Sequence, residues 1–279
     1  MIILDGKQTA EYIKEGLAEK IKNSNKRPPR LVIISVGDDP ASKVYVKNKL
    51  NSCGKVGIIA ENLIYDSSTS ADLIKKKIEI LNNDNTVDGI MVQLPLPSGY
   101  DERDIIDTIL PEKDVDGLTT INIGRLRAGD PTFIPCTAKG IMDLLSLYDI
   151  TLEGKNITII GRSNIVGKPF ADLALMKNAT VIQCHSKTAN LKEHIKNADI
   201  VVSAIGRPKY FTADIFEGSR CKILIDVGIN RDENGKLCGD IDPANLKCEY
   251  ITPVPGGVGP MTVAELLYNV VQSWEKSPY

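Results

Sequence analysis

Tyr45 and Lys49 are the residues whose types and spacing first suggest chemistry. They stand four positions apart in Ser-Lys-Val-Tyr-Val-Lys-Asn-Lys, residues 42–49. In a helix, side chains with this spacing leave the same face, one turn apart. An aromatic ring would then lie beside an ammonium group, and burial lowers the pKa of a lysine toward the working range of an enzyme. Such a pair can hold a flat ligand and move a proton next to it.

Three further segments could complete a site around this pair. Gln93 ends an apolar run in Val-Gln-Leu-Pro-Leu-Pro, where the prolines restrict the backbone and the amide can donate and accept hydrogen bonds. Asp116 lies in the turn-forming sequence Lys-Asp-Val-Asp-Gly. Residues 253–262, Pro-Val-Pro-Gly-Gly-Val-Gly-Pro-Met-Thr, are expected to form a rigid loop that suits close backbone approach to a flat ligand.

A nucleotide-binding signal follows in the second half of the chain. Residues 158–169, Thr-Ile-Ile-Gly-Arg-Ser-Asn-Ile-Val-Gly-Lys-Pro, predict a strand, a tight turn and a helix. Gly161 and Gly167 would let the backbone approach a pyrophosphate at the helix N-terminus. The fingerprint is incomplete, because Ser163 stands where a middle glycine is usual. A strand-to-helix turn with a solvated basic edge is the alternative interpretation, and the nucleotide interpretation is favoured over it.

The end of the next predicted strand bears on the choice of cofactor. NAD-binding folds usually place an acid there, on the adenosine ribose. This sequence has Cys-His-Ser-Lys at residues 184–187 and no acid. Arg162, Ser186 and Lys187 could instead accept a 2′-phosphate, which predicts NADP and makes NAD the less favoured cofactor. Gly206 and Gly228 end two more apolar strands, at the edge where ligands of open α/β sheets bind.

Strand and helix patterns alternate along the whole chain, which predicts an α/β fold. The second half has the pattern of a doubly wound, Rossmann-type parallel sheet. Residues 111–139 lack periodicity and are predicted to be a loop. We expect one domain from residues 1–138 with the last helix, 261–279, and a nucleotide-binding domain from 139–260. The expected strands are 30–36, 58–65, 87–94, 155–160, 179–184, 200–204 and 222–227; the expected helices are 9–22, 38–54, 70–81, 101–110, 137–148, 166–176, 189–198, 213–217 and 261–274.

Composition excludes several classes of protein. The net charge of −2 gives no basic field for nucleic acid, and no apolar run approaches the roughly 20 residues of a membrane span. The N-terminus does not resemble a signal peptide. The six cysteines are not spaced as zinc or redox pairs, and the chain has only two histidines, so we expect no metal site. Reduced, buried cysteines and a cytoplasmic location follow as expectations.

The motifs carry a resemblance to one family. Tyr45-xxx-Lys49, Val-Gln-Leu-Pro-Leu-Pro, Lys-Asp-Val-Asp-Gly, Gly-Arg-Ser-Asn-Ile-Val-Gly-Lys-Pro and the loop at 253–262 occur here in the order typical of bifunctional methylenetetrahydrofolate dehydrogenase/methenyltetrahydrofolate cyclohydrolases. The resemblance spans essentially residues 1–275. It implies two α/β domains flanking a cleft, a homodimer formed through the nucleotide-binding domains, NADP as cofactor and a folate as substrate. Ala138 is a departure, because the family usually has a proline there.

The resemblance also implies roles for individual residues. Lys49 would be the catalytic lysine of the cyclohydrolase step, Tyr45 would stack on the folate, Gln93 would hydrogen-bond Lys49 and Asp116 would bind the pterin amino groups. The substrate-binding residues would be Tyr45, Lys49, Val92, Gln93, Leu94, Asp116, Pro255, Gly256, Gly257, Val258 and Gly259. The cofactor-binding residues would be Gly161, Arg162, Ser163, Ile165, Val166, Ser186, Gly206 and Ile229.

Three alternatives remain from the sequence. A short-chain dehydrogenase also uses a Tyr-xxx-Lys pair, but there the pair follows the nucleotide turn, whereas here residues 45–49 precede Gly161 by more than 100 positions. A non-catalytic sensor of NADP or folate has no need for Tyr45, Lys49, Gln93 and Asp116 together. A dehydrogenase without cyclohydrolase activity would carry the same side chains.

Overall fold

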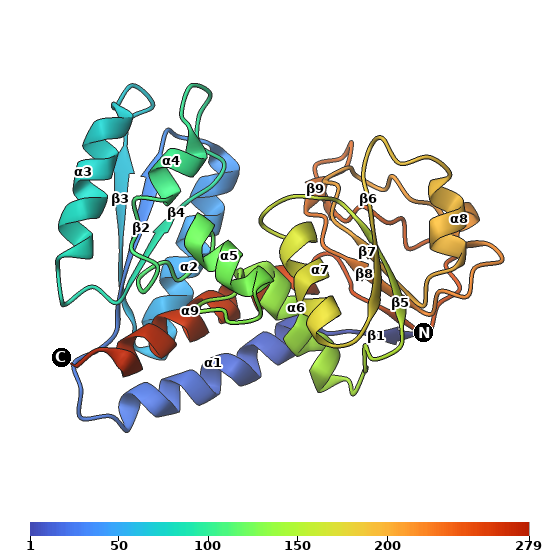
Figure 1. Cartoon of the computed structure of the whole chain (residues 1–279), viewed down its shortest axis with the longest axis horizontal. Coiled ribbons are helices and arrows are strands. Elements are labelled where there is room, and N and C mark those ends of the chain that lie inside the picture. The colour runs from blue at the N-terminus through green and yellow to red at the C-terminus, as the bar shows by residue number, and fades with distance from the viewer. Residues whose placement is uncertain (279) are drawn as a thin grey trace. The chain divides into compact units, whose positions relative to one another are not determined.

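The computed structural model describes residues 1–278, which form two compact units (Figure 1). Unit 1 consists of residues 1–10 and 135–262, and unit 2 of residues 11–134 with the C-terminal stretch from Val263. The predicted division differs at the N-terminus, because residues 1–10 belong to unit 1. The reason is β1 (Ile2–Ile3), which pairs in parallel with β11 (Tyr250–Ile251) at the edge of the unit 1 sheet.

Unit 2 contains a three-stranded parallel sheet in the order β3-β2-β4, formed by β3 (Ile59–Tyr65), β2 (Arg30–Val36) and β4 (Gly89–Val92). Val32, Ile34 and Val36 point to one face of the sheet and pack against α3 (Ala71–Asn82) and α4 (Glu102–Ile106). The helix α2 (Pro40–Val56) covers the other face (Figure 1). Strand alternation therefore buries alternate residues of β2 under different helices.

Unit 1 contains a six-stranded sheet in the order β1-β11-β8-β7-β5-β6, with every pairing parallel. The central strands are β5 (Asn156–Ile160), β6 (Thr180–Cys184), β7 (Ile200–Ser203) and β8 (Ile223–Asp226). The chain leaves β5 toward β6 and then returns to the other side of β5 with β7. This reversal is the switch point at which open α/β sheets bind ligands.

Helices and short segments complete both units. Unit 1 contains α6 (Cys136–Leu147), α7 (Gly167–Met176), α8 (Leu191–Lys196), a 3-10 turn (Ala213–Phe216) and the hairpin of β9 (Asn230–Arg231) and β10 (Leu237–Cys238). Unit 2 contains α5 (Thr120–Arg127), most of α1 (Gly6–Lys22) and most of α9 (Val258–Lys276).

The predicted loop at 111–139 was wrong in one respect, because it contains α5. This helix is capped by Thr119, whose side chain accepts a hydrogen bond from the Asn122 backbone N–H, and it buries only Asn122 and Leu126. Two buried residues give no apolar periodicity, so the sequence pattern missed it. The last helix also begins earlier than predicted, at Val258, and therefore includes part of the expected loop.

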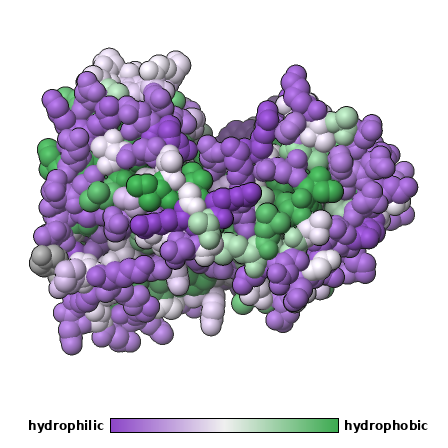
Figure 2. Space-filling model, viewed as in Figure 1, coloured by the Kyte–Doolittle hydropathy of each residue, from purple (hydrophilic) through white to green (hydrophobic). Residues whose placement is uncertain are grey.

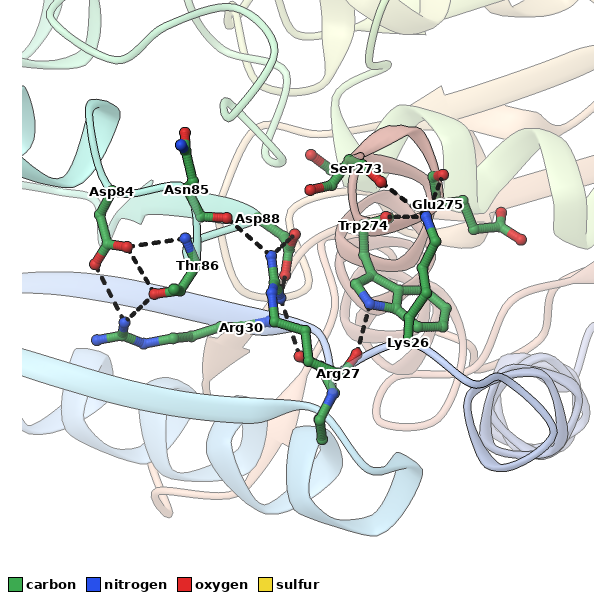
Figure 3. Close-up of polar contacts among 12 residues, drawn as sticks. Lys26, Arg27, Arg30, Asp84, Asn85, Thr86, Asp88, Ser273, Trp274 and Glu275 are labelled. Atoms are coloured by element: carbon green, nitrogen blue, oxygen red, sulfur yellow. Dashed lines mark hydrogen bonds and ion pairs between the residues drawn. The ribbon is translucent and has the colours of Figure 1, made fainter. Parts of the chain in front are cut away.

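The end of α9 is fixed to unit 2 by a buried tryptophan and a capping lysine (Figure 3). The indole Nε1 of Trp274 donates to the carbonyl oxygen of Arg27 at 2.7 Å. The ammonium of Lys26 donates to the carbonyl oxygens of Trp274, Glu275 and Ser277 at 3.4, 2.9 and 2.8 Å. A helix leaves its last carbonyl groups without helical partners, so Lys26 satisfies the C-terminus of α9.

Arg27 continues this anchor into the sheet. Its guanidinium donates to both carboxylate oxygens of Asp88 at 2.7 and 2.9 Å, and the Arg30 backbone N–H donates to the same carboxylate at 2.7 Å. Asp88 is buried and precedes β4, while Arg30 begins β2. The pKa of Arg27 is raised, chiefly by its hydrogen bonds to Asp88. The pair therefore connects the segment before β2 with the start of β4.

We expect Asp88→Asn to lower the free energy of unfolding by about 2–4 kcal/mol, because it removes the charge of a buried carboxylate that accepts from the Arg27 guanidinium and the Arg30 backbone N–H. Urea unfolding followed by circular dichroism measures this change. Asp104→Asn is the matched control, since Asp104 makes an exposed ion pair with Lys75 at 2.8 Å. Equal shifts of the unfolding midpoint in both variants would contradict the role given to Asp88.

The surface of both units is mostly hydrophilic on the face shown in Figure 2, with apolar areas of limited extent. Within residues 1–278, no helix combines the length and hydropathy needed to cross a membrane.

Candidate functional site

The helix α2 places Lys49 among its buried residues. Asp39 caps the helix by accepting from the Ser42 backbone N–H at 2.7 Å, Pro40 occupies the first turn and Gly57 ends it with a φ of 89°. The buried residues of α2 are Val46, Lys49, Cys53 and Val56, at spacings of three and four. Lys49 thus occupies a core-facing position that an apolar side chain would normally take, and it is 8% exposed.

Tyr45 lies one turn before Lys49 at the margin of the buried face, with 37% of its surface exposed. Cys53 lies one turn after Lys49 and is fully buried, so this side of the helix is shielded from water. Burial raises the pKa of the Cys53 thiol to about 12, against an opposing influence from the Lys49 charge. Exposure therefore decreases along this face of α2, from the partly exposed Tyr45 ring through the Lys49 ammonium to the fully buried Cys53 thiol.

Gln93 fixes the position of the Lys49 ammonium. Lys49 Nζ donates to Gln93 Oε1 at 2.9 Å, and Gln93 Nε2 donates to the carbonyl oxygen of Leu94 at 2.7 Å. The Gln93 backbone N–H donates to the carbonyl oxygen of Ile34 and so extends the β4–β2 pairing by one residue. Since both ends of the amide are used, its oxygen must face Lys49.

Val92 and Leu94 flank Gln93 and serve packing. Val92 is buried in the core cluster under α3 and α4, and Leu94 packs against the same cluster. The Val92 side chain therefore lies on the opposite face of the sheet from α2, and any ligand contact that it makes is through its backbone.

Asp116 is held near the end of β4 by a neighbour that the sequence analysis missed. An isolated parallel bridge pairs Ile90 of β4 with Asp114. Asp114 is buried and its carboxylate accepts from the backbone N–H groups of Leu118 and Thr119, from the Thr119 hydroxyl and from the Asn122 amide, at 2.8–3.1 Å. These bonds fix the turn that carries the half-buried Asp116.

The different roles of Asp114 and Asp116 are not visible in the sequence, because both acids stand in the same turn-forming motif. From α9, the Asn269 amide donates to the carbonyl oxygen of Val115 at 2.9 Å, between the two acids. Gly89 adds a steric reason for this packing, since a Cβ there would meet both γ-methyl groups of Val115 at 2.8 and 2.9 Å. The turn thus lies directly against β4.

A cavity of about 260 Å³ lies beside Gln93, under α2. Ser35, Asn62 and Gln93 contribute polar groups to its wall, with Ser35 Oγ donating to Asn62 Oδ1 at 2.8 Å. The wall from α2 includes Lys43 and Lys47, on the flank of the helix away from Tyr45 and Lys49. Gln93 is therefore in contact with Lys49 and also with a hollow of small-molecule size.

The glycine-rich segment belongs to unit 1, whereas Tyr45, Lys49, Gln93 and Asp116 belong to unit 2. Its backbone packs on the beginning of α1: the Lys7 N–H donates to the Gly256 carbonyl oxygen at 2.9 Å, and a Cβ on Gly6 would overlap the Gly257 carbonyl. Pro255 and Gly256 form the turn, while Val258 and Gly259 lie in the first turn of α9.

The turn after β5 lies at the switch point of the unit 1 sheet. The Gly161 N–H donates to the Cys184 carbonyl oxygen at 2.9 Å, and a Cβ on Gly161 would overlap the carbonyl oxygen of Ala204, the residue after β7. With a φ of 135°, this position also disfavours any other residue. A Cβ on Gly167 would in turn overlap the Gly161 carbonyl oxygen, so helix and strand meet as in nucleotide-binding turns.

The residues of this turn are exposed and polar. Ser163 takes the place of the missing glycine by accepting from the Val166 backbone N–H at 3.1 Å, which closes the turn before α7. Arg162 and Ile165 are exposed. Since Ile160 and Cys184 are register partners, Arg162 and Ser186 each lie two residues beyond a paired strand end. Arg162, Ser186 and Lys187 bring cationic and hydroxyl donors and no acid to this edge, which suits a phosphate.

Two buried aspartates connect the loops after β7 and β8, and neither was predicted from the sequence. Asp240 accepts from Ser203 Oγ, the Ile205 N–H, the Arg207 N–H and Asn230 Nδ2, at 2.8–3.0 Å. Asp226 accepts from the N–H groups of Gly228, Asp240 and Ile241 at 2.8–3.0 Å. The sequence signal for them is an acid within two residues of a glycine, in Asp-Val-Gly at 226–228 and Gly-Asp at 239–240. That pattern is common in turns.

The glycines beside these acids are interlocked with them. A Cβ on Gly228 would overlap the Asp240 carboxylate, and a Cβ on Gly239 would overlap the Asp226 carboxylate. The Asp240 carboxylate therefore occupies the space where Gly228 lacks a side chain, and the Asp226 carboxylate occupies the space where Gly239 lacks one. The predicted cofactor residues Gly206 and Ile229 follow the same strands, with Gly206 at a φ of 65° and Ile229 44% exposed.

Burial raises the pKa of Asp226 from 3.8 to about 6, with the Asp240 charge acting in the same direction and three backbone N–H groups acting against it. Between these values the folded protein retains a proton that the unfolded chain has lost. This contribution to stability is complete below pH 3.8 and disappears as the pH rises through about 6.

We therefore expect the free energy of unfolding of the wild type to fall by about 2 kcal/mol more than that of Asp226→Asn between pH 4 and pH 7. Urea unfolding of both proteins across this range gives the difference, and titrating groups that do not interact with Asp226 cancel in the comparison. Parallel stability curves would show that Asp226 titrates at its ordinary pKa.

Within the described residues, no group of three or more histidine, cysteine, aspartate or glutamate side chains is arranged to hold a metal ion.

Comparisons with known proteins agree across the chain. The family profile described as "Tetrahydrofolate dehydrogenase/cyclohydrolase, catalytic domain" matches residues 4–116, and the profile described as its "NAD(P)-binding domain" matches residues 135–278. The bifunctional protein FolD of Bacillus cytotoxicus is 47% identical over 283 aligned positions, which cover 100% of this chain and 98% of that protein.

Two solved structures are similar over the same extent. The bifunctional enzyme FolD of Campylobacter jejuni is 44% identical with a TM-score of 0.94, and the alignment covers 99% of each chain. The methylenetetrahydrofolate dehydrogenase-cyclohydrolase of Trypanosoma brucei, solved with NADP and an inhibitor, is 33% identical with a TM-score of 0.92, over 99% of this chain and 98% of that one.

Proposed function

The chain belongs to the tetrahydrofolate dehydrogenase/cyclohydrolase family, and on this premise we propose how its residues divide the two reactions. The protein oxidises 5,10-methylenetetrahydrofolate to the 5,10-methenyl compound with NADP and then hydrolyses that product to 10-formyltetrahydrofolate. The observation that carries the assignment is the 2.9 Å hydrogen bond between the buried Lys49 ammonium and Gln93.

The dehydrogenase step needs positioning more than proton transfer. When bound, NADP would supply the acceptor for the hydride of the methylene carbon, and the product is already a delocalised cation, so no side chain has to remove a proton. We assign to Tyr45 the stacking contact that holds the folate, and to Asp116 the hydrogen bonds to the pterin amino groups. The fixed Asp114 network supports this role, because it keeps the Asp116 turn rigid.

The cyclohydrolase step requires proton movement. Water adds to the methenyl carbon, the bond from this carbon to one ring nitrogen breaks, that nitrogen gains a proton and one proton is released. Lys49 is placed to carry these protons, since its Nζ is buried and its direction is set by Gln93. A lysine free to rotate would lose this alignment, so Gln93 acts as the positioning partner of Lys49.

We expect Lys49→Met to abolish cyclohydrolase activity while part of the dehydrogenase activity remains, because only hydrolysis moves a proton through Lys49. The assay supplies methylenetetrahydrofolate with NADP and follows NADPH and the 10-formyl product together. The wild type should form both products, and the variant should accumulate the methenyl compound.

Lys55→Met is the matched control, an exposed lysine of the same helix that lies outside the cavity wall. It should behave as the wild type in both assays. Equal loss of both activities in a folded Lys49→Met protein would refute the division of roles, and a wild type that forms NADPH but no 10-formyl product would identify a dehydrogenase without the second activity.

The cofactor contacts are assigned to the strand ends of unit 1. We assign the 2′-phosphate to Arg162 and Ser186, the pyrophosphate to the turn from Gly161 through Ser163, Ile165 and Val166, and the nicotinamide half to Gly206 and Ile229. The β5–β6 register supports the first assignment, since it brings Arg162 and Ser186 to adjacent positions. The substrate side of unit 1 would be the segment from Pro255 to Gly259.

Arg162→Ala should raise the Michaelis constant for NADP at least tenfold and leave that for NAD within about twofold, because one charge-assisted contact to phosphate is worth roughly 1.5–3 kcal/mol. Initial rates of NADPH and NADH formation give both constants. Lys177→Ala is the control, an exposed lysine at the C-terminal end of α7, outside the nucleotide-binding turn. An unchanged preference for NADP would exclude Arg162 from the 2′-phosphate site.

We further propose a homodimer formed through unit 1 and a cytoplasmic location. The family resemblance supports the dimer. The cysteines support the location: five of the six are buried, and all six are free thiols.

A further inference from the structure

Asp240 accepts hydrogen bonds from four donors in two separate segments, residues 203–207 and Asn230. Its Oδ2 accepts from Ser203 Oγ at the end of β7 and from the Ile205 N–H, at 2.9 and 2.8 Å. Its Oδ1 accepts from the Arg207 N–H and from Asn230 Nδ2, at 2.9 and 3.0 Å. The side chain is completely buried. A carboxylate has about four acceptor positions and no donor, so it satisfies all four groups at once.

Three of the four donors are direct neighbours of two exposed positions, Gly206 and Ile229. Ile205 and Arg207 lie on either side of Gly206, and Asn230 follows Ile229, which is 44% exposed. Gly206 has a φ of 65°, so the loop after β7 turns sharply between its two bonds to Asp240. Thus one buried carboxylate fixes the backbone on both sides of Gly206 and the residue after Ile229.

The second carboxylate holds the first in place. Asp226 Oδ1 accepts from the backbone N–H of Asp240 and from that of Gly228, which precedes Ile229, at 3.0 and 2.9 Å. A Cβ on Gly228 would overlap the Asp240 carboxylate, so the loop after β8 lies directly on it. The loops after β7 and β8 are therefore joined through buried carboxylates as well as through the parallel backbone bridge between Phe211 and Ile241.

These loops lie on the β7–β8 side of the switch point, while Arg162 and Ser186 follow β5 and β6. In doubly wound folds the adenosine half of a dinucleotide lies over the ends of the first two strands, and the nicotinamide half lies over the other side. We propose that Asp240 is a positioning residue that holds Gly206 and Ile229 against the nicotinamide half of NADP. This inference rests on the NADP site assigned above to the strand ends of unit 1.

The test compares two ligands by calorimetric titration, NADP and its adenosine half, 2′,5′-ADP. Asp240→Asn retains the shape of the side chain but replaces one acceptor with a donor that faces backbone N–H groups or the Asn230 amide. We expect the dissociation constant for NADP to rise at least tenfold and that for 2′,5′-ADP to change less than twofold. A general disturbance of unit 1 would weaken both ligands and would overturn the proposal.

Two controls keep the result interpretable. Asp242→Asn makes the same change two residues away, where the carboxylate accepts from the local Ala244 N–H, and should leave NADP binding unchanged. Cyclohydrolase turnover of supplied methenyltetrahydrofolate without NADP should stay within twofold of the wild type, which shows that the remainder of the protein is intact. If Asp240→Asn does not fold, Asn230→Ala removes one donor and should selectively weaken NADP by about threefold.

The outcomes separate this inference from the function that it builds on. If Arg162→Ala weakens both NADP and 2′,5′-ADP while the Asp240 and Asn230 variants bind both as the wild type does, the positioning role of Asp240 is wrong and the NADP site stands. If Arg162→Ala also leaves both ligands unaffected, the assigned NADP site is wrong, and the proposal for Asp240 falls with it.

Discussion

Parallel strands impose the constraint on which the functional arrangement of both units depends. Because each crossover returns the chain to the same edge, the carboxyl ends of all strands in a sheet lie together. In unit 2 this edge carries Gln93 after β4 and the Asp116 turn beside it. In unit 1 it carries Gly161, Ser186, Gly206 and Ile229 after four different strands. The site residues are distant in sequence and near in space for this reason.

The loops at these edges would be mobile if only their own turns held them, and buried polar side chains supply the missing rigidity. Asp114 fixes the loop after β4, while Asp226 and Asp240 fix the loops after β7 and β8. In each case a carboxylate removed from water accepts several backbone N–H groups, because an unsatisfied buried charge is costly. These acids need not touch a ligand to be important for binding one.

Lys49 shows the opposite use of burial. Its ammonium is placed on the core-facing side of α2, beside Cys53, where an apolar side chain would stabilise the helix more. Gln93 provides one strong acceptor and fixes its direction. Such a position reduces stability in exchange for a reactive group of defined geometry, a pattern expected at active sites and rare elsewhere.

The sequence by itself determined the periodic elements and the residues with local signals. Strand β2 was predicted at its observed bounds, and the pair Tyr45 and Lys49 was predicted to lie on one helical turn, because side-chain spacing depends only on local backbone geometry. The same holds for the Gly161 turn, whose glycines have a local steric reason. The motifs at Gln93, Asp116 and residues 253–262 indicated the family in the same way.

Only the tertiary structure decided which polar residues meet. The helix α5, the edge strand β1 and the roles of Asp114, Asp226 and Asp240 were not predicted. Two residues such as Ser203 and Asp240, 37 positions apart, become partners only when the sheet has formed. Hydrogen bonds between distant segments leave no period in the sequence, and a buried aspartate has the same letter as one in a solvated turn.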